Sequence, residues 1–183
     1  PYFYGYKTAG VFQNMAEVQA YVNKDGNMIM PDAKPGDVRF VDVNGDGEIS
    51  PDDRTNIGNG TPKWTFGFNF NAEWKGFDLN LFLQGVTGNK VFDATYRTDV
   101  FSGNFPTWML DRWTGEGTSN KYPILKNGDA TNWQVSDLYL CDGSYLRLKN
   151  ISLGYTLPKQ LTQKWSISHL RFYVMAENLI TWT

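Results

Sequence analysis

The amino-acid sequence predicts an all-β protein that forms part of an antiparallel transmembrane β-barrel. Long segments alternate strictly between apolar and polar residues, short turns join the predicted strands at one end, and long loops join them at the other. The 18 glycines and an aromatic content of 16% are typical of a β-rich chain with many turns. No run of about 18 apolar residues occurs, which argues against a transmembrane helix and is compatible with strands that cross a membrane.

The charge balance and the rare residue types exclude other classes of protein. The chain of 183 residues carries 17 lysines and arginines against 19 aspartates and glutamates, a formal net charge of -2. A nucleic-acid-binding protein would need a basic surface to neutralise phosphates, so no nucleic-acid partner is expected. With 41% hydrophobic residues, the composition also differs from that of a disordered acidic tail. A single cysteine and a single histidine exclude a disulfide framework and a histidine-rich metal site.

The clearest strand signal lies in residues 64–74. Tryptophan stands at both ends of this segment, phenylalanine or alanine recurs at every second position between them, and the alternate positions are mostly polar. About ten residues is also the length that a tilted strand needs to cross a membrane. Lys75 and Gly76 form a short turn, after which residues 77–86 alternate again. The two segments therefore predict a β-hairpin.

Two further strands are predicted near the end of the chain. Residues 145–157 alternate, but the leucines up to Leu148 are out of phase with the apolar residues from Ile151 onward. We therefore expect a β-bulge near Asn150. Residues 170–181 then alternate once more.

A fifth strand is predicted over residues 2–11, and the connections between the strands are unequal in length. The segments of about 12–62 and 87–142 form long loops, whereas the turns are short. A transmembrane barrel has this asymmetry, although a soluble β-sandwich or jelly roll with long loops fits the same alternation. Tryptophan at the strand ends favours the barrel, because its ring favours membrane interfaces. The expected lipid-facing residues are Trp64, Phe66, Phe68, Phe70, Phe77, Leu79, Leu81, Leu83, Ile151, Leu153, Phe172 and Val174.

The most specific local motif covers residues 42–53. Oxygen-bearing side chains at its first, third and fifth positions, glycine at the sixth and a carboxylate at the twelfth reproduce the spacing of an EF-hand calcium loop. Aspartate in place of glutamate at the twelfth position is a shorter ligand, which predicts modest affinity. The alternative is a metal-free cluster of Asx turns. The expected ligands of a structural Ca²⁺ ion are Asp42, Asn44, Asp46, Glu48 (through its backbone carbonyl) and Asp53.

Four aromatic residues stand among glycine, asparagine and threonine in the second long loop: Trp108, Trp113, Tyr122 and Trp133. Such rings can stack on the sugar rings or peptide side chains of a ligand, or they can form the small internal core that keeps a long loop compact. No phosphate loop, dinucleotide motif or isolated carboxylate pair occurs, so the chain is not expected to be an enzyme.

Several segments, in their order along the chain, resemble the SusC/RagA-like TonB-dependent outer-membrane transporters. Each segment alone is short, but the ordered set is specific and covers nearly the whole chain. The segments are YGYKTAGVFQN at 4–14, KPGDV at 34–38, DVNGDG at 42–47, DRTNIGN at 53–59, GFDLNLFLQG at 76–85, DGSYLRLKNISLGY at 142–155 and ENL at 177–179.

The resemblance implies both a fold and a function. Residues 1–183 would be a partial, C-terminal segment of a 22-stranded antiparallel barrel with an internal plug and long extracellular loops. Such a transporter imports a large nutrient, a glycan or a peptide, across the outer membrane of a Gram-negative bacterium. The implied partners are a SusD-like surface lipoprotein, outer-membrane lipid and the TonB complex, the last through an N-terminal part outside this stretch. The alternative function is that of a soluble, calcium-stabilised, carbohydrate-binding β-domain.

Overall fold

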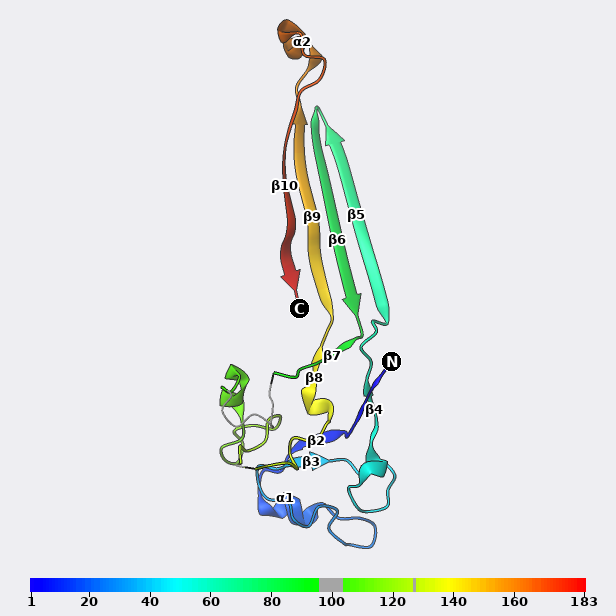
Figure 1. Ribbon diagram of the computed structural model, residues 1–183, viewed down its shortest axis with the longest axis vertical. Helices are drawn as coiled ribbons and strands as arrows, with labels where there is room; N and C mark the ends of the chain where they lie inside the picture. Colours follow the sequence, from blue (N-terminus) through cyan, green and yellow to red (C-terminus); the bar gives the residue numbers. More distant parts are fainter. Residues whose placement is uncertain (96–103, 127) are drawn as a thin grey trace. The chain divides into compact units, whose positions relative to one another are not determined.

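The protein divides into two compact units in a computed structural model (Figure 1). The first unit comprises residues 1–60 and 90–141, and the second comprises residues 61–89 and 142–183. Strands predominate, and among the described residues no helix is both long enough and apolar enough to span a membrane. The structure describes residues 1–95, 104–126 and 128–183, so parts of the long loop predicted over 87–142 lie outside the described residues.

The second unit is a four-stranded antiparallel sheet in the order β10-β9-β6-β5. The pairing of β5 with β6 runs without a break along both strands, and the turn between them consists of Lys75 and Gly76. Both turn residues have positive φ, at 47° and 86°, as a two-residue hairpin turn matched to the strand twist requires. The strands are β5 (Trp64–Trp74), β6 (Phe77–Thr87), β9 (Tyr145–Thr156) and β10 (Arg171–Trp182).

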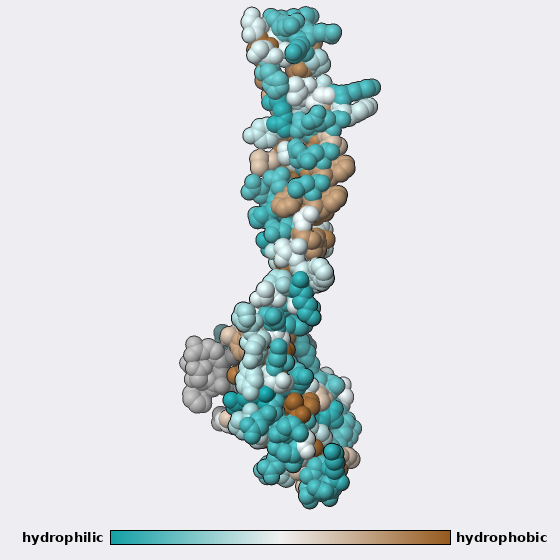
Figure 2. Space-filling model, turned by 90° about the vertical axis from the view of Figure 1, so that its right-hand side faces the viewer, coloured by the Kyte–Doolittle hydropathy of each residue, from teal (hydrophilic) through white to brown (hydrophobic). Residues whose placement is uncertain are grey.

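One face of this sheet is apolar along all four strands, because cross-strand partners share a face. Phe68 lies opposite Leu83 and Phe70 opposite Leu81, whereas the neighbouring Asn71 lies opposite Asn80. Figure 2 shows hydrophobic side chains grouped on the strands of the second unit. Many of them are exposed within the described chain, among them Trp64, Phe66, Phe68, Phe70, Trp74, Phe77, Leu153, Phe172 and Val174.

Two bulges at one level of the sheet keep the apolar face continuous. Between β6 and β9 the register shifts at Lys149, so Phe82 pairs with Asn150 and Leu83 with Leu148. A second shift follows in β10 after Glu177. The bulge expected near Asn150 is therefore confirmed. Because an extra residue reverses the alternation, the leucines before Lys149 join the face of the apolar residues after it.

An ion pair crosses the sheet from β6 to β10, on the face opposite the apolar one. Arg171 donates through Nε to Asp78 Oδ1 at 3.0 Å and through Nη2 to Asp78 Oδ2 at 2.6 Å. Gly154 of β9 lies between the two residues, and a Cβ atom there would stand 2.4 Å from Asp78 Oδ1 and 2.5 Å from Arg171 Nη2. The pair can form because the intervening strand has no side chain at this position.

The described residues of the first unit form three two-stranded sheets, a short helix and 3-10 turns around a small core. Tyr6, Val38 and Phe40 form this core, and partly buried Met30 and Ile49 pack against it. The paired strands are β1 (Phe3–Gly5) with β4 (Thr55–Gly58), β2 (Thr8–Val11) with β3 (Val38–Phe40), and β7 (Lys90–Phe92) with β8 (Leu140–Asp142). The helical segments are α1 (Met15–Ala20), η1 (Pro51–Asp53), η2 (Thr107–Asp111) and η3 (Asp137–Tyr139).

The strand expected over residues 2–11 is corrected by the structure. It is divided into β1 and β2, which pair with different strands in different sheets. Between them Tyr6 is buried in the core of the first unit, and its backbone N–H bonds the carbonyl of Val135 at 3.0 Å. Residues 2–11 thus belong to the first unit, and among the described residues four long strands remain in place of the five that were predicted.

The crossing ion pair yields a first prediction. Gly154→Ala places a carbon atom where the Asp78 and Arg171 side chains meet, so one of them must move. Inserting one carbon into a packed site costs about 1–3 kcal/mol. We expect a lower thermal unfolding midpoint for the full-length protein in detergent. Gly115→Ala is the control, because no atom lies within 4 Å of the added Cβ. Equal midpoints for the two variants would contradict the role of Gly154.

Candidate functional site

The loop of residues 42–53 follows β3 and ends in the 3-10 turn η1. Its glycines Gly45 and Gly47 have φ values of 77° and 89°, in the region that glycine adopts at no steric cost. This backbone wraps around the first carboxylate of the loop. Asp42 accepts hydrogen bonds from the N–H of Gly45 at 2.6 Å and from the N–H of Gly47 at 2.9 Å.

The middle of the loop is held by Asn44 and Asp46. Asn44 Oδ1 accepts from the N–H of Asp46 at 2.9 Å, and its Nδ2 donates to Asp46 Oδ2 at 2.7 Å. The other Asp46 oxygen accepts from the N–H of Glu48 at 3.0 Å. Consecutive Asx turns of this kind direct side-chain oxygens toward the inside of the loop. The side chains of Asn44, Asp46 and Glu48 are exposed.

Asp53 closes the loop from a fully buried position. Its Oδ1 accepts from the N–H of Val43 and its Oδ2 from the N–H of Ser50, both at 2.8 Å. Ser50 also caps η1, and Pro51 occupies the first position of that turn, where a missing N–H costs nothing. The side chain of Asp53 has 0% exposure, so these hydrogen bonds take the place of the water that burial excludes.

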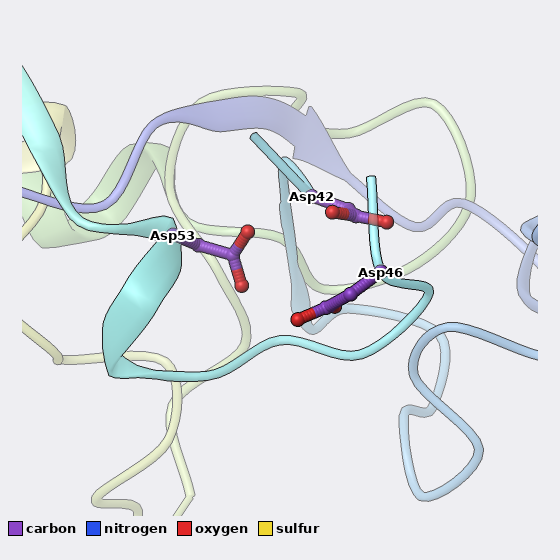
Figure 3. A group of neighbouring side chains, drawn as sticks. All are labelled: Asp42, Asp46 and Asp53. Atoms are coloured by element: carbon purple, nitrogen blue, oxygen red, sulfur yellow. The ribbon is translucent and has the colours of Figure 1, made fainter. Parts of the chain in front are cut away.

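Three carboxylates converge as a result. One oxygen each from Asp42, Asp46 and Asp53 lies within 4.8 Å of the others. Figure 3 shows Asp42 and Asp46 extending from the loop and Asp53 from η1, with their carboxylates facing a common space. Carboxylate oxygens at this spacing are ligands that Ca²⁺ prefers, so the donor set fits the cation expected from the sequence. Of the five expected ligands, this cluster contains three.

Tyr21, which follows α1, supports the start of the loop. Its hydroxyl donates to the carbonyl of Phe40 at 2.7 Å and accepts from the N–H of Asp42 at 3.4 Å. Burial raises the pKa of the Tyr21 phenol above its ordinary value, so the hydroxyl retains the proton that it donates. Asn23 lies against Gly47, at the position that a Cβ atom would occupy. The segment after α1 therefore packs on the loop.

The four loop aromatics do not form one open platform. Trp108 stacks on Tyr122 with ring centroids 4.6 Å apart, and it also contacts Trp133 at 6.3 Å. Trp133 is buried, with 7% exposure. Trp113 lies elsewhere in the unit, where its Nε1 donates to Gln13 Oε1 at 3.3 Å. These contacts favour the internal-core interpretation, and a ligand role for the four residues stays a prediction.

A buried polar contact that the sequence pattern did not predict joins the two long loops. Asn132 is 1% exposed; its Oδ1 accepts from the N–H of Val38 at 2.7 Å, and its Nδ2 donates to Asp37 Oδ1 at 2.9 Å. Lys126 forms an ion pair with Asp37. These groups lie beside a cavity of about 570 Å³ lined by both loops. No motif connects residues so distant in sequence, so only the folded chain reveals them.

Comparison with known proteins finds relatives along the whole chain. No protein-family model matches it. The TonB-dependent receptor P3 of Formosa agariphila is 37% identical over 185 residues, which cover 99% of this chain and 17% of that receptor. The TonB-dependent receptor P26 of the same organism is 30% identical over 100% of this chain and 18% of its own length. These relatives are receptors and not enzymes.

Solved structures resemble the chain as well. The RagAB peptide importer in its 'open-open' state matches with a TM-score of 0.67 and 28% identity, over 100% of this chain and 19% of the matched chain. The same importer in its 'closed-closed' state matches with a TM-score of 0.65. The chain thus spans about a fifth of the length of the proteins that it matches, and its strands correspond to a fragment of a β-barrel transporter.

The buried carboxylate of Asp53 yields a second prediction. Asp53→Ala removes the acceptor for the N–H groups of Val43 and Ser50, and each donor left unpaired costs about 1–3 kcal/mol. We expect these two amides to exchange hydrogen much faster, which hydrogen-exchange mass spectrometry of the full-length protein can measure. The neighbouring Asp52→Ala is the control, because that side chain is exposed. Unchanged protection of both amides in Asp53→Ala would contradict the prediction.

Proposed function

We propose, from the premise that this chain belongs to the SusC/RagA-like TonB-dependent receptors, that its long strands form part of the wall of an outer-membrane importer. The receptor would import a large nutrient across the outer membrane of a Gram-negative bacterium. Its other residues would complete a barrel of 22 strands, enclose a plug and contact the TonB complex. A SusD-like lipoprotein would bind at the cell surface.

The apolar face of the four-stranded sheet carries this proposal. It is continuous through two bulges, largely exposed within the described chain, and bounded by Trp64 and Trp74 along β5. Ten residue steps of about 3.3 Å, tilted by about 40°, cover about 25 Å, which is the height of the apolar band of outer-membrane barrels. Tryptophan at both ends of the strand suits the two interfaces of a bilayer.

The opposite face suits the interior of such a barrel. Asn69, Asn71 and Asn80 and the ion pair between Asp78 and Arg171 lie there. Polar side chains of this kind are stable against water and costly against lipid. A soluble carbohydrate-binding domain, the alternative function, would instead have to cover the aromatic face with protein. The similarity to receptors and to an importer favours the barrel.

We propose peptides as the first substrate class to test, with glycans as the second. The support is the RagAB importer, which is named for peptides and is 28% identical to this chain. Growth of a strain that lacks the full-length receptor, on oligopeptides or on oligosaccharides as the only source, would distinguish the two classes. Restoration of growth by the intact gene is the required control.

We also propose that residues 42–53 bind a structural Ca²⁺ ion. Asp42, Asp46 and Asp53 would supply carboxylate oxygens, and Asn44 and the backbone carbonyl of Glu48 would complete the ligand set. The ion would offset the mutual repulsion of three carboxylates that the loop holds together. Its role would be to stabilise the fold of the first long loop.

The lipid-facing role yields a third prediction. Phe68→Arg places a charge near the middle of the apolar face, where a barrel loses about 2–4 kcal/mol. We expect much less folded receptor in the outer membrane, measured by heat-modifiable electrophoresis of membrane fractions. Asn69→Arg is the matched control, because the adjacent side chain lies on the opposite face. Equal amounts of folded protein from both variants, or a receptor that stays soluble without detergent, would overturn the proposal.

The calcium site yields a fourth prediction. Ca²⁺ should slow hydrogen exchange in residues 42–53 of the full-length receptor, and a chelator should reverse the effect. Asp46→Ala should abolish the difference, because it removes one ligand and leaves the bonds of Asp53 in place. Asp52→Ala should behave as wild type. The site is refuted if exchange in this loop is the same with and without chelator.

A further inference from the structure

The connection between β9 and β10 is a compact cap and not an extended linker. It contains α2 (Lys159–Thr162) and the 3-10 turn η4 (Gln163–Trp165). The N–H of Leu157 bonds the carbonyl of Leu170 at 3.0 Å, which closes the cap at its base. Thr162 is 1% exposed, and its carbonyl accepts from the N–H of Ile167 at 3.1 Å. The backbone of the cap is therefore internally bonded.

The cap nevertheless leaves large apolar side chains uncovered. Leu161, Trp165 and Ile167 are 48%, 63% and 36% exposed. Leu161 and Trp165 are four residues apart across α2 and η4, a spacing that places them on one side of a helical segment. The cap buries the polar Thr162 and exposes tryptophan and leucine. In a protein surrounded by water, apolar side chains are usually buried and polar ones exposed, so the cap has the reverse arrangement.

The cap is also basic. Residues 157–170 contain Lys159, Lys164 and one histidine, and no acidic residue. Figure 1 shows α2 beyond the strand ends, at the same end of the sheet as the turn between β5 and β6. That turn adds Lys75, whose ammonium group lies 4.8 Å from the centre of the Trp74 ring. Exposed lysine and tryptophan thus occur together at both connections at this end.

We propose that this end of the sheet binds anionic phospholipid headgroups through Lys75, Lys159 and Lys164, with Leu161 and Trp165 inserted at the level of the headgroups. The proposal deepens the proposed function and rests on it, because it requires the sheet to span the membrane. Short turns of an outer-membrane barrel face the periplasm, so the lipid belongs to the periplasmic leaflet. A phospholipid with net negative charge, such as phosphatidylglycerol, is the chemical class.

The combination of charges and apolar groups favours lipid over an acidic protein. Lysines next to a membrane gain attraction from anionic headgroups, and tryptophan has its preferred position at the interface. Charge or apolar insertion alone gives weak membrane binding, whereas the two together give stable binding. Both signals lie in one small cap here. Glu73 and Asp78 at this end lie on the polar face of the sheet, and Asp78 is paired with Arg171.

The test uses the full-length receptor, purified in detergent and probed with phosphatidylglycerol and phosphatidylcholine by native mass spectrometry. The triple variant Lys75→Gln, Lys159→Gln, Lys164→Gln should retain far less phosphatidylglycerol, with affinity about fivefold weaker for each lysine lost. The triple variant Lys7→Gln, Lys24→Gln, Lys63→Gln is the matched control. These three lysines are also exposed, and none of them lies in the cap or in the turn between β5 and β6.

A second measurement tests the apolar half of the surface. In nanodiscs, the difference in tryptophan fluorescence between the wild type and Trp165→Phe reports the emission of Trp165. Lipids brominated near the headgroup should quench this emission. The proposal is overturned if that fluorescence is not quenched, or if both triple variants bind phosphatidylglycerol as wild type does. A wild type without preference for phosphatidylglycerol would also overturn it and would favour an acidic protein. In each of these cases, a receptor that still inserts into nanodiscs is consistent with the proposed importer function. A receptor that stays soluble without detergent contradicts both the headgroup-binding proposal and the importer function.

Discussion

Side chains of a β-strand alternate between the two faces of its sheet. In the second unit, the apolar side chains of all four strands have to lie on the same face. This constraint organises the sheet. A single residue out of step would move asparagine to the apolar face and leucine to the polar face along the rest of a strand. The shifts at Lys149 and after Glu177 absorb the extra residues at one level of the sheet, so the phase of β9 and β10 is restored on both sides. The two shifts in strand pairing are therefore what keeps the apolar face continuous.

The first unit is organised by hydrogen bonds to buried carboxylates, because its strands are short and its core is small. Asp53 accepts hydrogen bonds from three backbone N–H groups within its own loop, and Asp37 accepts one from the side-chain amide of Asn132 in the other long loop. Each buried carboxylate therefore fixes the path of a segment that has no sheet to support it. Other backbone N–H groups of the same loop bond Asp42 and Asp46. The close approach of Asp42, Asp46 and Asp53 is therefore a product of the loop's own folding.

The alternation of apolar and polar residues predicted those parts of the fold that depend on local sequence. The alternation around Lys75-Gly76 coincides with β5 and β6, and the phase change before Ile151 indicated the bulge in β9. The same rule failed for residues 2–11, because alternating residues suit one long strand and two short strands of a folded loop alike. Only the burial of Tyr6 in the folded chain distinguishes the two. The contact of Asn132 with Asp37 could not be predicted from the sequence, because no spacing rule links residues that only tertiary packing brings together.

The two long hairpins of the second unit have a consequence for the order of folding. β5 and β6 are joined by two residues, and β9 and β10 by one compact cap, so each pair closes a short loop. The pairing of β6 with β9 instead closes the long stretch between Thr87 and Tyr145, at a larger cost in chain entropy. Chain entropy therefore favours formation of each hairpin before the two hairpins pair with one another. When they pair, the bulge at Lys149 has to be in place, because a slip by one residue would put apolar side chains beside polar ones.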